Sequence, residues 1–159
     1  MTTGYVYDPL YLEHDSSTHP ENKRRLEQTI DHLQKAGLLA RMQPVAARDA
    51  SLEELSAVHL LGHIERVQHT AAGGGGWLDP DTYVGVRSYD AAVRAAGGLL
   101  AAVQAVLDGE VDNAFALVRP PGHHALANRS MGFCLFNNIA VAARYALQQH
   151  GLQLSLIHI

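Results

Sequence analysis

AFALVRPPGHHA, residues 114–125, is the stretch of this sequence that decides the fold. Its first five residues form a continuous apolar run, which is typical of a strand buried on both faces of a parallel sheet. Two prolines and a glycine then restrict the path by which the chain leaves that strand. His123 and His124 follow directly, at the strand end where the loops of open α/β sheets form ligand sites.

The segments on either side of this strand alternate between strand and helix patterns. Apolar spacing and capping residues predict further strands and helices. Strands are expected at residues 5–7 and 42–47, and helices from Pro20 to Gly37, from Ser51, at 62–69, at 87–107 and at 136–149. This order predicts one domain of the α/β class, with an open parallel sheet flanked by helices.

Composition excludes several classes of function. The chain has 159 residues, of which 47% are hydrophobic, and a formal charge of -4, so no net charge favours binding to nucleic acid or an anionic membrane. The amino-terminal residues lack the features of a signal peptide, and polar side chains interrupt the most apolar segment. The glycine run 73–76 predicts a loop and not a phosphate site, because no Lys-Ser or Lys-Thr pair follows it. A soluble, cytoplasmic protein is expected.

The two adjacent histidines are open to more than one interpretation. Tandem histidines in a loop often have no function, but a position at a strand end favours a role. They could act as an acid–base pair, one ring neutral and one charged, or as metal ligands. Cys134, the only cysteine, is a possible nucleophile with either histidine as its base, although its apolar neighbours favour a packing role.

Three stretches of this sequence together resemble one known family. RPPGHHA at 119–125 followed by MGFCLFNNIAVAARYA at 131–146 is similar to the tandem-histidine motif of the histone deacetylase and acetylpolyamine amidohydrolase family. YDPLYLEHDSSTHPENKRRLE at 7–27 resembles its opening strand, loop and helix, and WLDPDTYVGVRSYDAAVRAAGG at 77–98 resembles its rim loop and following helix. The similarity extends to about Gln153 and is stronger to the class II and bacterial branch. Lys23 and Leu60-Leu61-Gly62 depart from the usual pattern.

The resemblance implies an arginase/deacetylase-like fold and hydrolysis of an acyl-lysine or acetylpolyamine amide with the help of zinc. His124 would be the general base and then the general acid, and His123 would stay protonated beside the tetrahedral anion. The expected substrate contacts are a tunnel wall from Phe133, the backbone carbonyl of Gly132 and an amide contact at Asp81. The family's internal-channel arginine would be Arg25.

The residues that hold zinc in this family, an Asp-x-His pair and a later Asp, are expected beyond this sequence, as is the family's later Tyr. We therefore expect residues 1–153 to be the amino-terminal portion of a deacetylase catalytic domain, incomplete, inactive alone and binding no zinc. Residues 154–159, LSLIHI, match the translation of a common transposon-end sequencing adapter, so a non-native tail is expected. A genuine strand containing His158 is the competing interpretation.

Two alternatives belong to other classes. A non-catalytic module could bind acylated amines without cleaving them, and a cysteine hydrolase could use Cys134. The expected partner in the leading interpretation is an acylated lysine or polyamine, and the sequence does not predict an oligomeric state. An incomplete parallel sheet would leave an uncovered strand edge, which predicts poor solubility.

Overall fold

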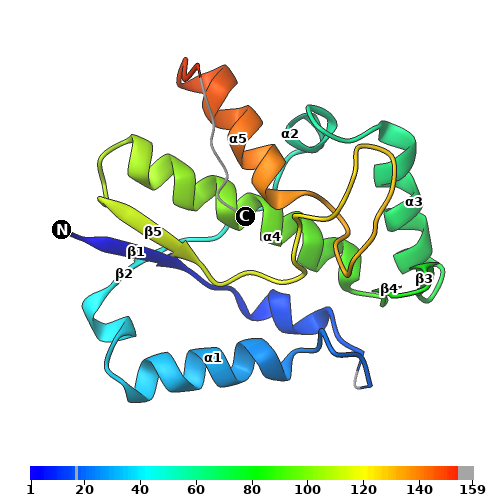
Figure 1. Cartoon of the computed structure of the whole chain (residues 1–159), viewed down its shortest axis with the longest axis horizontal. Helices are drawn as coiled ribbons and strands as arrows, with labels where there is room; N and C mark the ends of the chain where they lie inside the picture. The colour runs from blue at the N-terminus through cyan, green and yellow to red at the C-terminus, as the bar shows by residue number, and fades with distance from the viewer. Residues whose placement is uncertain (17, 154–159) are drawn as a thin grey trace.

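A computed structural model describes residues 1–16 and 18–153 of the chain, so the predicted tail at 154–159 lies outside the described residues (Figure 1). Strands and helices alternate through most of the chain, as the sequence predicts. The strands are β1 (Thr3–Val6), β2 (Gln43–Val45), β3 (Gly76–Asp79), β4 (Thr82–Val84) and β5 (Asn113–Ala116). The α-helices are α1 (Arg24–Lys35), α2 (Leu52–Ser56), α3 (Leu61–Ala72), α4 (Ser88–Leu107) and α5 (Asn138–Gln149), with short 3-10 turns η1 (Pro9–Glu13) and η2 (Leu39–Arg41).

The main sheet has three parallel strands in the order β2-β1-β5. The first strand of the chain is therefore central, and Tyr5 of β1 lies opposite Pro44 of β2 and Phe115 of β5. The open parallel sheet confirms the predicted α/β class. Because all three strands run the same way, their carboxyl ends meet at one edge, where the loop to His123 and His124 begins.

Helices cover both faces of this sheet (Figure 1). Side chains alternate along a strand, so Val6 points into the core beside α4, whereas Tyr5 and Tyr7 pack on the opposite side with Leu26 of α1. The close approach of α4 depends on its glycines. A β-carbon added at Gly98 would touch Val6 and collide with the Tyr11 hydroxyl.

Helix α4 is the central helix of the core. Ten of its 20 residues are buried, most of them Ala or Gly, which lets neighbouring elements approach closely. By length and apolarity alone α4 could cross a membrane, a test that core helices also pass. Its packing against β1, β5 and α5 identifies α4 as a core helix.

Helix α1 begins four residues later than the sequence predicts. Pro20 suits a first helical turn, but the Asn22 side chain accepts a hydrogen bond from the Arg24 amide and holds a turn there, so the helix begins only after Lys23. The predicted end is correct, because Gly37 adopts a φ of 68°, the left-handed conformation common after helices.

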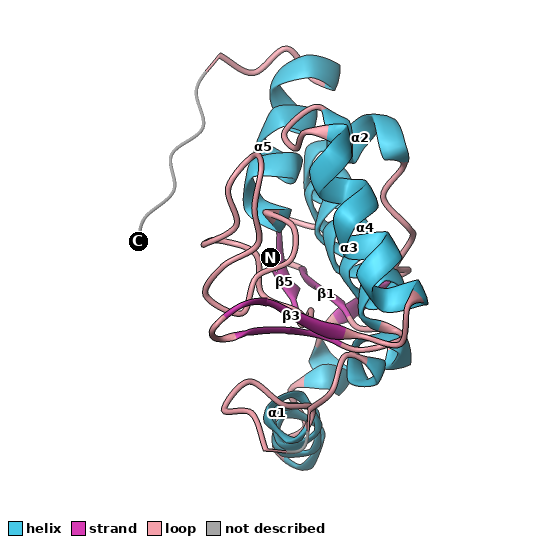
Figure 2. Cartoon of the chain, turned by 90° about the vertical axis from the view of Figure 1, so that its right-hand side faces the viewer, coloured by secondary structure: helices cyan, strands magenta, loops and turns pink. Residues whose placement is uncertain are grey.

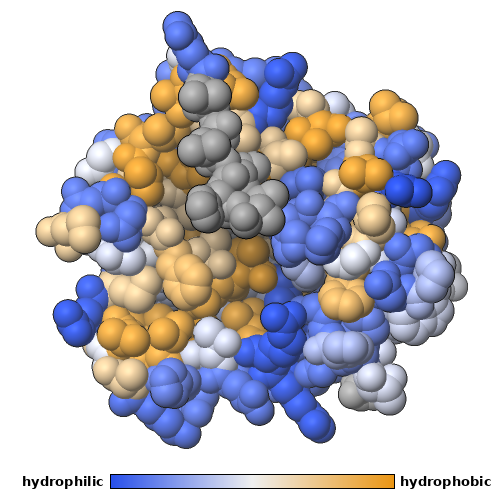
Figure 3. Space-filling model, viewed as in Figure 1, coloured by the Kyte–Doolittle hydropathy of each residue, from blue (hydrophilic) through white to orange (hydrophobic). Residues whose placement is uncertain are grey.

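The prediction that β5 is buried on both faces is wrong for this structure. β5 is an edge strand, and Phe115 on its α1 side is 49% exposed. Apolar residues gather on the side of the molecule where β5 lies (Figure 3). Between β5 and α1 runs a groove of about 670 Å³, lined by residues that include Arg25, Phe115 and Arg119.

A β-hairpin of β3 and β4 was not predicted from the sequence. It lies at the right of the molecule in Figure 1 and faces the viewer in Figure 2, next to α3. The preceding glycine run is the predicted loop, and Gly74 and Gly75 have φ values of 101° and 93°. The hairpin turn places Asp81 at an exposed tip.

Candidate active site

The loop that leaves β5 holds the two histidines side by side. The ring centroids of His123 and His124 are 4.2 Å apart, with the rings inclined by 52°, and both side chains are exposed. The start of α5 fixes this loop. Asn138 donates a side-chain hydrogen bond to the Pro120 carbonyl at 3.1 Å, and Asn137 donates to the Ala125 carbonyl at 2.9 Å.

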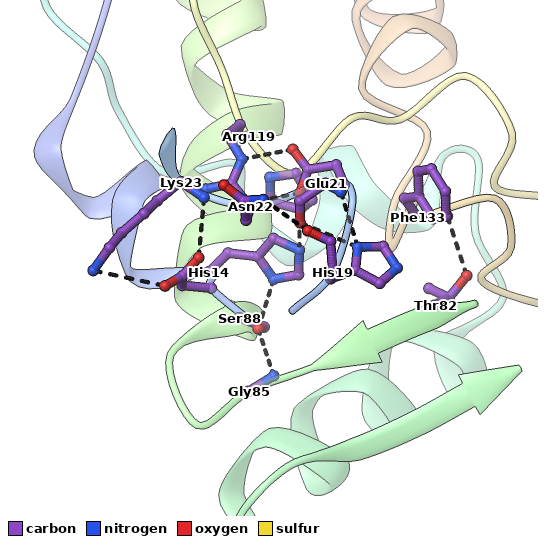
Figure 4. Close-up of polar contacts among 12 residues, drawn as sticks. His14, His19, Glu21, Asn22, Lys23, Thr82, Gly85, Ser88, Arg119 and Phe133 are labelled. Atoms are coloured by element: carbon purple, nitrogen blue, oxygen red, sulfur yellow. Dashed lines mark hydrogen bonds and ion pairs between the residues drawn. The ribbon is translucent and has the colours of Figure 1, made fainter. Parts of the chain in front are cut away.

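A buried ion pair anchors the other end of the loop (Figure 4). Arg119 donates from Nε and Nη2 to the two carboxylate oxygens of Glu21, at 2.6 Å each, and from Nη1 to the Tyr11 carbonyl at 3.2 Å. The arginine and the glutamate are 4% and 3% exposed. Such a bidentate pair fixes direction as well as distance. The segment before α1 therefore sets where the histidine loop starts.

His14 extends this buried cluster toward the hairpin. Its Nδ1 lies 2.7 Å from the hydroxyl of Ser88, which accepts a hydrogen bond from the Gly85 amide, and its Nε2 lies 3.8 Å from the Glu21 carboxylate. Burial lowers the pKa of His14 to about 4, although Glu21 opposes the shift. At neutral pH the ring is uncharged.

The segment after the histidines folds back against His124. Gly132 has a φ of 57°, and a β-carbon there would lie 2.8 Å from atoms of the His124 ring, so only glycine fits without displacing the imidazole. Phe133 also has a positive φ, 69°, which is uncommon for an aromatic residue. Its amide donates to the Thr82 hydroxyl at 3.2 Å, so β4 holds this conformation in place.

His19 joins the hairpin tip to Phe133 (Figure 4). The rings of His19 and Phe133 meet edge to face with centroids 4.7 Å apart. Nε2 of His19 lies 3.0 Å from the Asp81 carbonyl, which only accepts, so this nitrogen carries the proton. The Glu21 amide can then donate to Nδ1 at 3.1 Å.

Four of the predicted site residues thus lie in one continuous set of contacts: His124, Gly132, Phe133 and Asp81. His123 adjoins them through His124. Arg25 lies apart, in the groove between α1 and β5, with its side chain 64% exposed and Nη1 3.6 Å from Glu21.

Comparison with known proteins places this arrangement in a family. The model of the histone deacetylase domain matches residues 19–158, which is most of the chain. The chain belongs to the histone deacetylase family. Both the predicted family and the predicted fold are confirmed.

Relatives in this family come from several kingdoms. The chain is 45% identical over 150 residues to a histone deacetylase-like amidohydrolase of Pseudomonas aeruginosa, covering 94% of the chain and 38% of that protein. It is 41% identical to a probable deacetylase of Archaeoglobus fulgidus, covering 94% and 42%. The crystal structure of the HDA15 HD domain superposes with a TM-score of 0.90 at 38% identity, covering 94% of this chain and 44% of the other. The chain therefore spans less than half the length of these relatives.

A catalytic zinc needs a set of protein ligands that the described residues do not supply. Among residues 1–16 and 18–153, no group of three or more His, Cys, Asp or Glu side chains is placed to hold a metal ion. The histidine pair alone supplies two nitrogens, whereas a catalytic zinc normally has three protein ligands. The described part of this histone deacetylase family member does not fit a catalytic zinc.

Cys134 has the surroundings of a packing residue. It is fully buried, and its thiol donates to the Gly132 carbonyl with Sγ and O 3.3 Å apart. Burial raises the pKa of the thiol, which disfavours the thiolate that a nucleophile requires.

Several supporting residues were not predicted from the sequence. His59 lies beneath the loop after the histidines, donating from Nδ1 to the Leu126 carbonyl at 3.0 Å and accepting from the Asn137 amide at Nε2, 2.9 Å away. Burial lowers the pKa of His59 to about 4, with His63 adding to the shift. Glu21 and Arg119 lie within motifs that the sequence displays, but their pairing joins positions 98 residues apart. No local pattern reports such a contact.

Proposed function

We propose that this chain carries the acid–base part of an amide hydrolase site in a larger deacetylase. The observation that carries the proposal is the contact of the His123 and His124 rings, 4.2 Å apart, on a loop anchored by Arg119 and the start of α5. A loop fixed at both ends holds the imidazoles at defined positions, which proton transfer requires.

The two rings have different roles in this proposal. His124 as the neutral ring takes a proton from the attacking water and then returns it to the nitrogen of the leaving amine. His123 as the charged ring stabilises the oxyanion of the tetrahedral intermediate.

The surrounding residues support an acylated amine as the substrate. Phe133 would form a wall beside the aliphatic part of an acyl-lysine or an acetylpolyamine. Gly132 would accept a hydrogen bond from the substrate at its backbone carbonyl, and Asp81 would bind an amide at the rim. Relatives described as deacetylases and amidohydrolases favour catalysis in the whole protein over binding of acyl-amines alone.

Zinc enters the proposal only as a cofactor of the whole protein. When bound it would polarise the amide carbonyl and acidify water. Since the described residues do not fit a catalytic zinc, we expect this chain alone to bind none and to hydrolyse no amide. We propose the cytoplasm as its location.

The test is a chimera that joins this chain to the part of a relative that this chain does not cover. Residues 1–150 replace the matching part of the Pseudomonas amidohydrolase, to which this chain is 45% identical over 150 residues. We expect hydrolysis of acetyl-lysine peptide or acetylspermidine by the chimera and none by the chain alone. His124→Ala should lower kcat by at least about 100-fold, whereas His150→Ala is a control outside the site. A folded, metal-loaded chimera whose kcat is unchanged by His124→Ala would refute the proposed role.

A further inference from the structure

Trp77, the single tryptophan of the chain, lies on the rim of the site with no assigned role. It belongs to β3 and is 57% exposed. Two other rings frame it, since the ring centroids of Trp77 and Tyr83 are 5.4 Å apart and those of Trp77 and His19 are 5.9 Å apart. Trp77 therefore presents an exposed indole face that two neighbouring rings hold in place.

This aromatic group is continuous with the proposed acid–base site. His19 lies between Trp77 and Phe133, and its ring meets that of Phe133 at 4.7 Å. Phe133 follows Gly132, which packs on the His124 ring. A row of three rings, those of Trp77, His19 and Phe133, therefore runs from the rim to the residue after Gly132, beside the histidine pair.

The same rim carries two carboxylates. Asp79 ends β3, and Asp81 is exposed at the hairpin tip. Partial burial opposes ionisation of Asp79, but hydrogen bonds from Thr82 and from the Asp81 amide outweigh it and hold its pKa below the ordinary value. Among the ion pairs of the described residues neither carboxylate has a basic partner, whereas Arg87 nearby pairs with Asp90 at 2.6 Å. The rim thus combines aromatic faces with unneutralised negative charge.

We propose that Trp77 and Tyr83, with Asp79 and Asp81, form a subsite for an alkylammonium group that the substrate carries at a distance from its acylated nitrogen. A cation over an indole face is attracted by the ring, and nearby carboxylates add a Coulombic attraction. The inference rests on the proposed function, because that function places the acyl amide at the histidine pair. Two sources supply this chemistry: the free amines of an acetylpolyamine, and a basic side chain near an acyl-lysine in a peptide.

The test uses the intrinsic fluorescence of the unaltered chain, since Trp77 is its only tryptophan. The probe is N-acetylspermidine, and the matched neutral compound is N-butylacetamide. We expect a saturable change in Trp77 fluorescence with the cationic probe only, weakening as salt is raised. Equal responses to both compounds, or no response to either, would overturn the subsite.

Variants of the chain separate the cation–π attraction of the indole from the Coulombic attraction of the carboxylates. By calorimetry, Trp77→Leu should weaken binding of N-acetylspermidine about threefold to fivefold, and Trp77→Phe should restore part of it, because cation–π attraction is strongest for indole. Asp79→Asn with Asp81→Asn should weaken binding and reduce its salt dependence. Asp108→Asn, at the distant end of α4, is the charge-matched control and should change nothing. Unchanged affinity in Trp77→Leu would overturn the proposal.

A second arm distinguishes the two sources. An acetyl-lysine peptide with neighbouring lysines is compared with the same peptide carrying glutamines there. Lysine-dependent binding identifies a basic peptide as a ligand of the subsite, and binding of N-acetylspermidine alone identifies a polyamine. If neither ligand binds, the proposed subsite is refuted. The activity of the chimera remains a separate test of the proposed function.

Discussion

At the scale of single residues, burial determines how much each ion pair contributes to stability. Arg119 and Glu21 are almost fully buried and satisfy one another with two hydrogen bonds at 2.6 Å. The pair of Lys35 and Asp31 on α1 has a similar distance, 2.8 Å, but lies in solvent. Removing one member of a buried pair leaves the other charge buried without a partner, which costs stability. At the surface, water replaces the lost partner, so the cost is small.

The first prediction compares these two pairs. Glu21→Ala should lower the free energy of unfolding by about 3–5 kcal/mol, because it leaves the Arg119 guanidinium buried without a counter-charge. Lys35→Ala should cost less than about 0.5 kcal/mol. Urea denaturation followed by circular dichroism measures both values. Equal, small losses would show that the buried pair does not anchor the histidine loop.

The second prediction concerns the glycine beneath His124. Gly132→Ala should lower the free energy of unfolding by about 1–3 kcal/mol, because the new methyl group meets the His124 ring at a left-handed φ of 57°. It should also shift the imidazole resonances of His124 in a two-dimensional NMR spectrum. Gly62→Ala in α3, where the added carbon meets no side chain or neighbouring element within 4 Å, is the control. That variant should be neutral or slightly stabilising.

Sequence reasoning at this scale located the residues that carry a motif. His123, His124, Gly132 and Phe133 could be predicted as site residues because they stand close together in two recognisable stretches. His19 could not, since its contacts with Asp81 and Trp77 span 58 or more positions and depend on how the hairpin folds. Long-range hydrogen bonds leave no periodic signal in a sequence.

At the scale of elements, contacts between residues close together in the sequence could be predicted, whereas the burial of a whole strand could not. The capping box of α2 is present, with the Ser51 hydroxyl accepting from the Glu54 amide and the Glu54 carboxylate accepting from the Ser51 amide. It could be predicted because both partners are three residues apart. The exposure of β5 could not, because the number of faces that a strand buries depends on which neighbours it acquires.

A third prediction tests the close packing of α4. Gly97→Ala should lower the free energy of unfolding by about 3 kcal/mol, because the added carbon collides with the backbone at Arg48, Asp49 and Ala50, which cannot rotate away. Gly109→Ala imposes a φ of 74° on alanine but meets no neighbour, so about 1 kcal/mol is expected. Thermal denaturation of the two variants compares the stability lost to the steric collision at Gly97 with the stability lost to backbone strain at Gly109. A smaller loss in Gly97→Ala than in Gly109→Ala would contradict this packing.

At the scale of the whole molecule, buried histidines make stability depend on pH, and burial lowers the pKa of His63 as well as those of the two histidines below. Burial lowers the pKa of both His14 and His59 from 6.5 to about 4. Between these values the unfolded chain binds protons that the folded chain does not, so stability rises with pH across the window. Full stability is present above about pH 6.5 and is lost as the pH falls toward 4.

The fourth prediction follows from this sign. The midpoint of urea denaturation should fall steadily from pH 7 to pH 4.5. His59→Gln should flatten the slope, because glutamine can donate to Leu126 and accept from Asn137 without titrating. His69→Gln, at an exposed position of α3, should leave the slope unchanged. A pH-independent midpoint in the unaltered chain would contradict the burial of both histidines.

A fifth prediction concerns the two edges of the sheet. β2 carries Pro44, which hinders pairing with another chain, but β5 presents Asn-Ala-Phe-Ala with Phe115 half exposed. The chain should therefore self-associate at micromolar concentration, and Phe115→Lys should reduce this association. Leu38→Lys, an exposed position after α1, is the control. Analytical ultracentrifugation measures the effect, and a monodisperse unaltered chain would contradict it.

The central position of β1 has a consequence for synthesis on the ribosome. β1 pairs with β5, whose first residue, Asn113, is added 110 residues after its partner Thr3. During synthesis, β1 cannot pair with β5, and Glu21 cannot pair with Arg119, until Arg119 has emerged from the exit tunnel. Because such long closures are slow, assembly of the histidine loop is a late event, and chaperones that shield apolar strands would act on this chain before residue 119 appears.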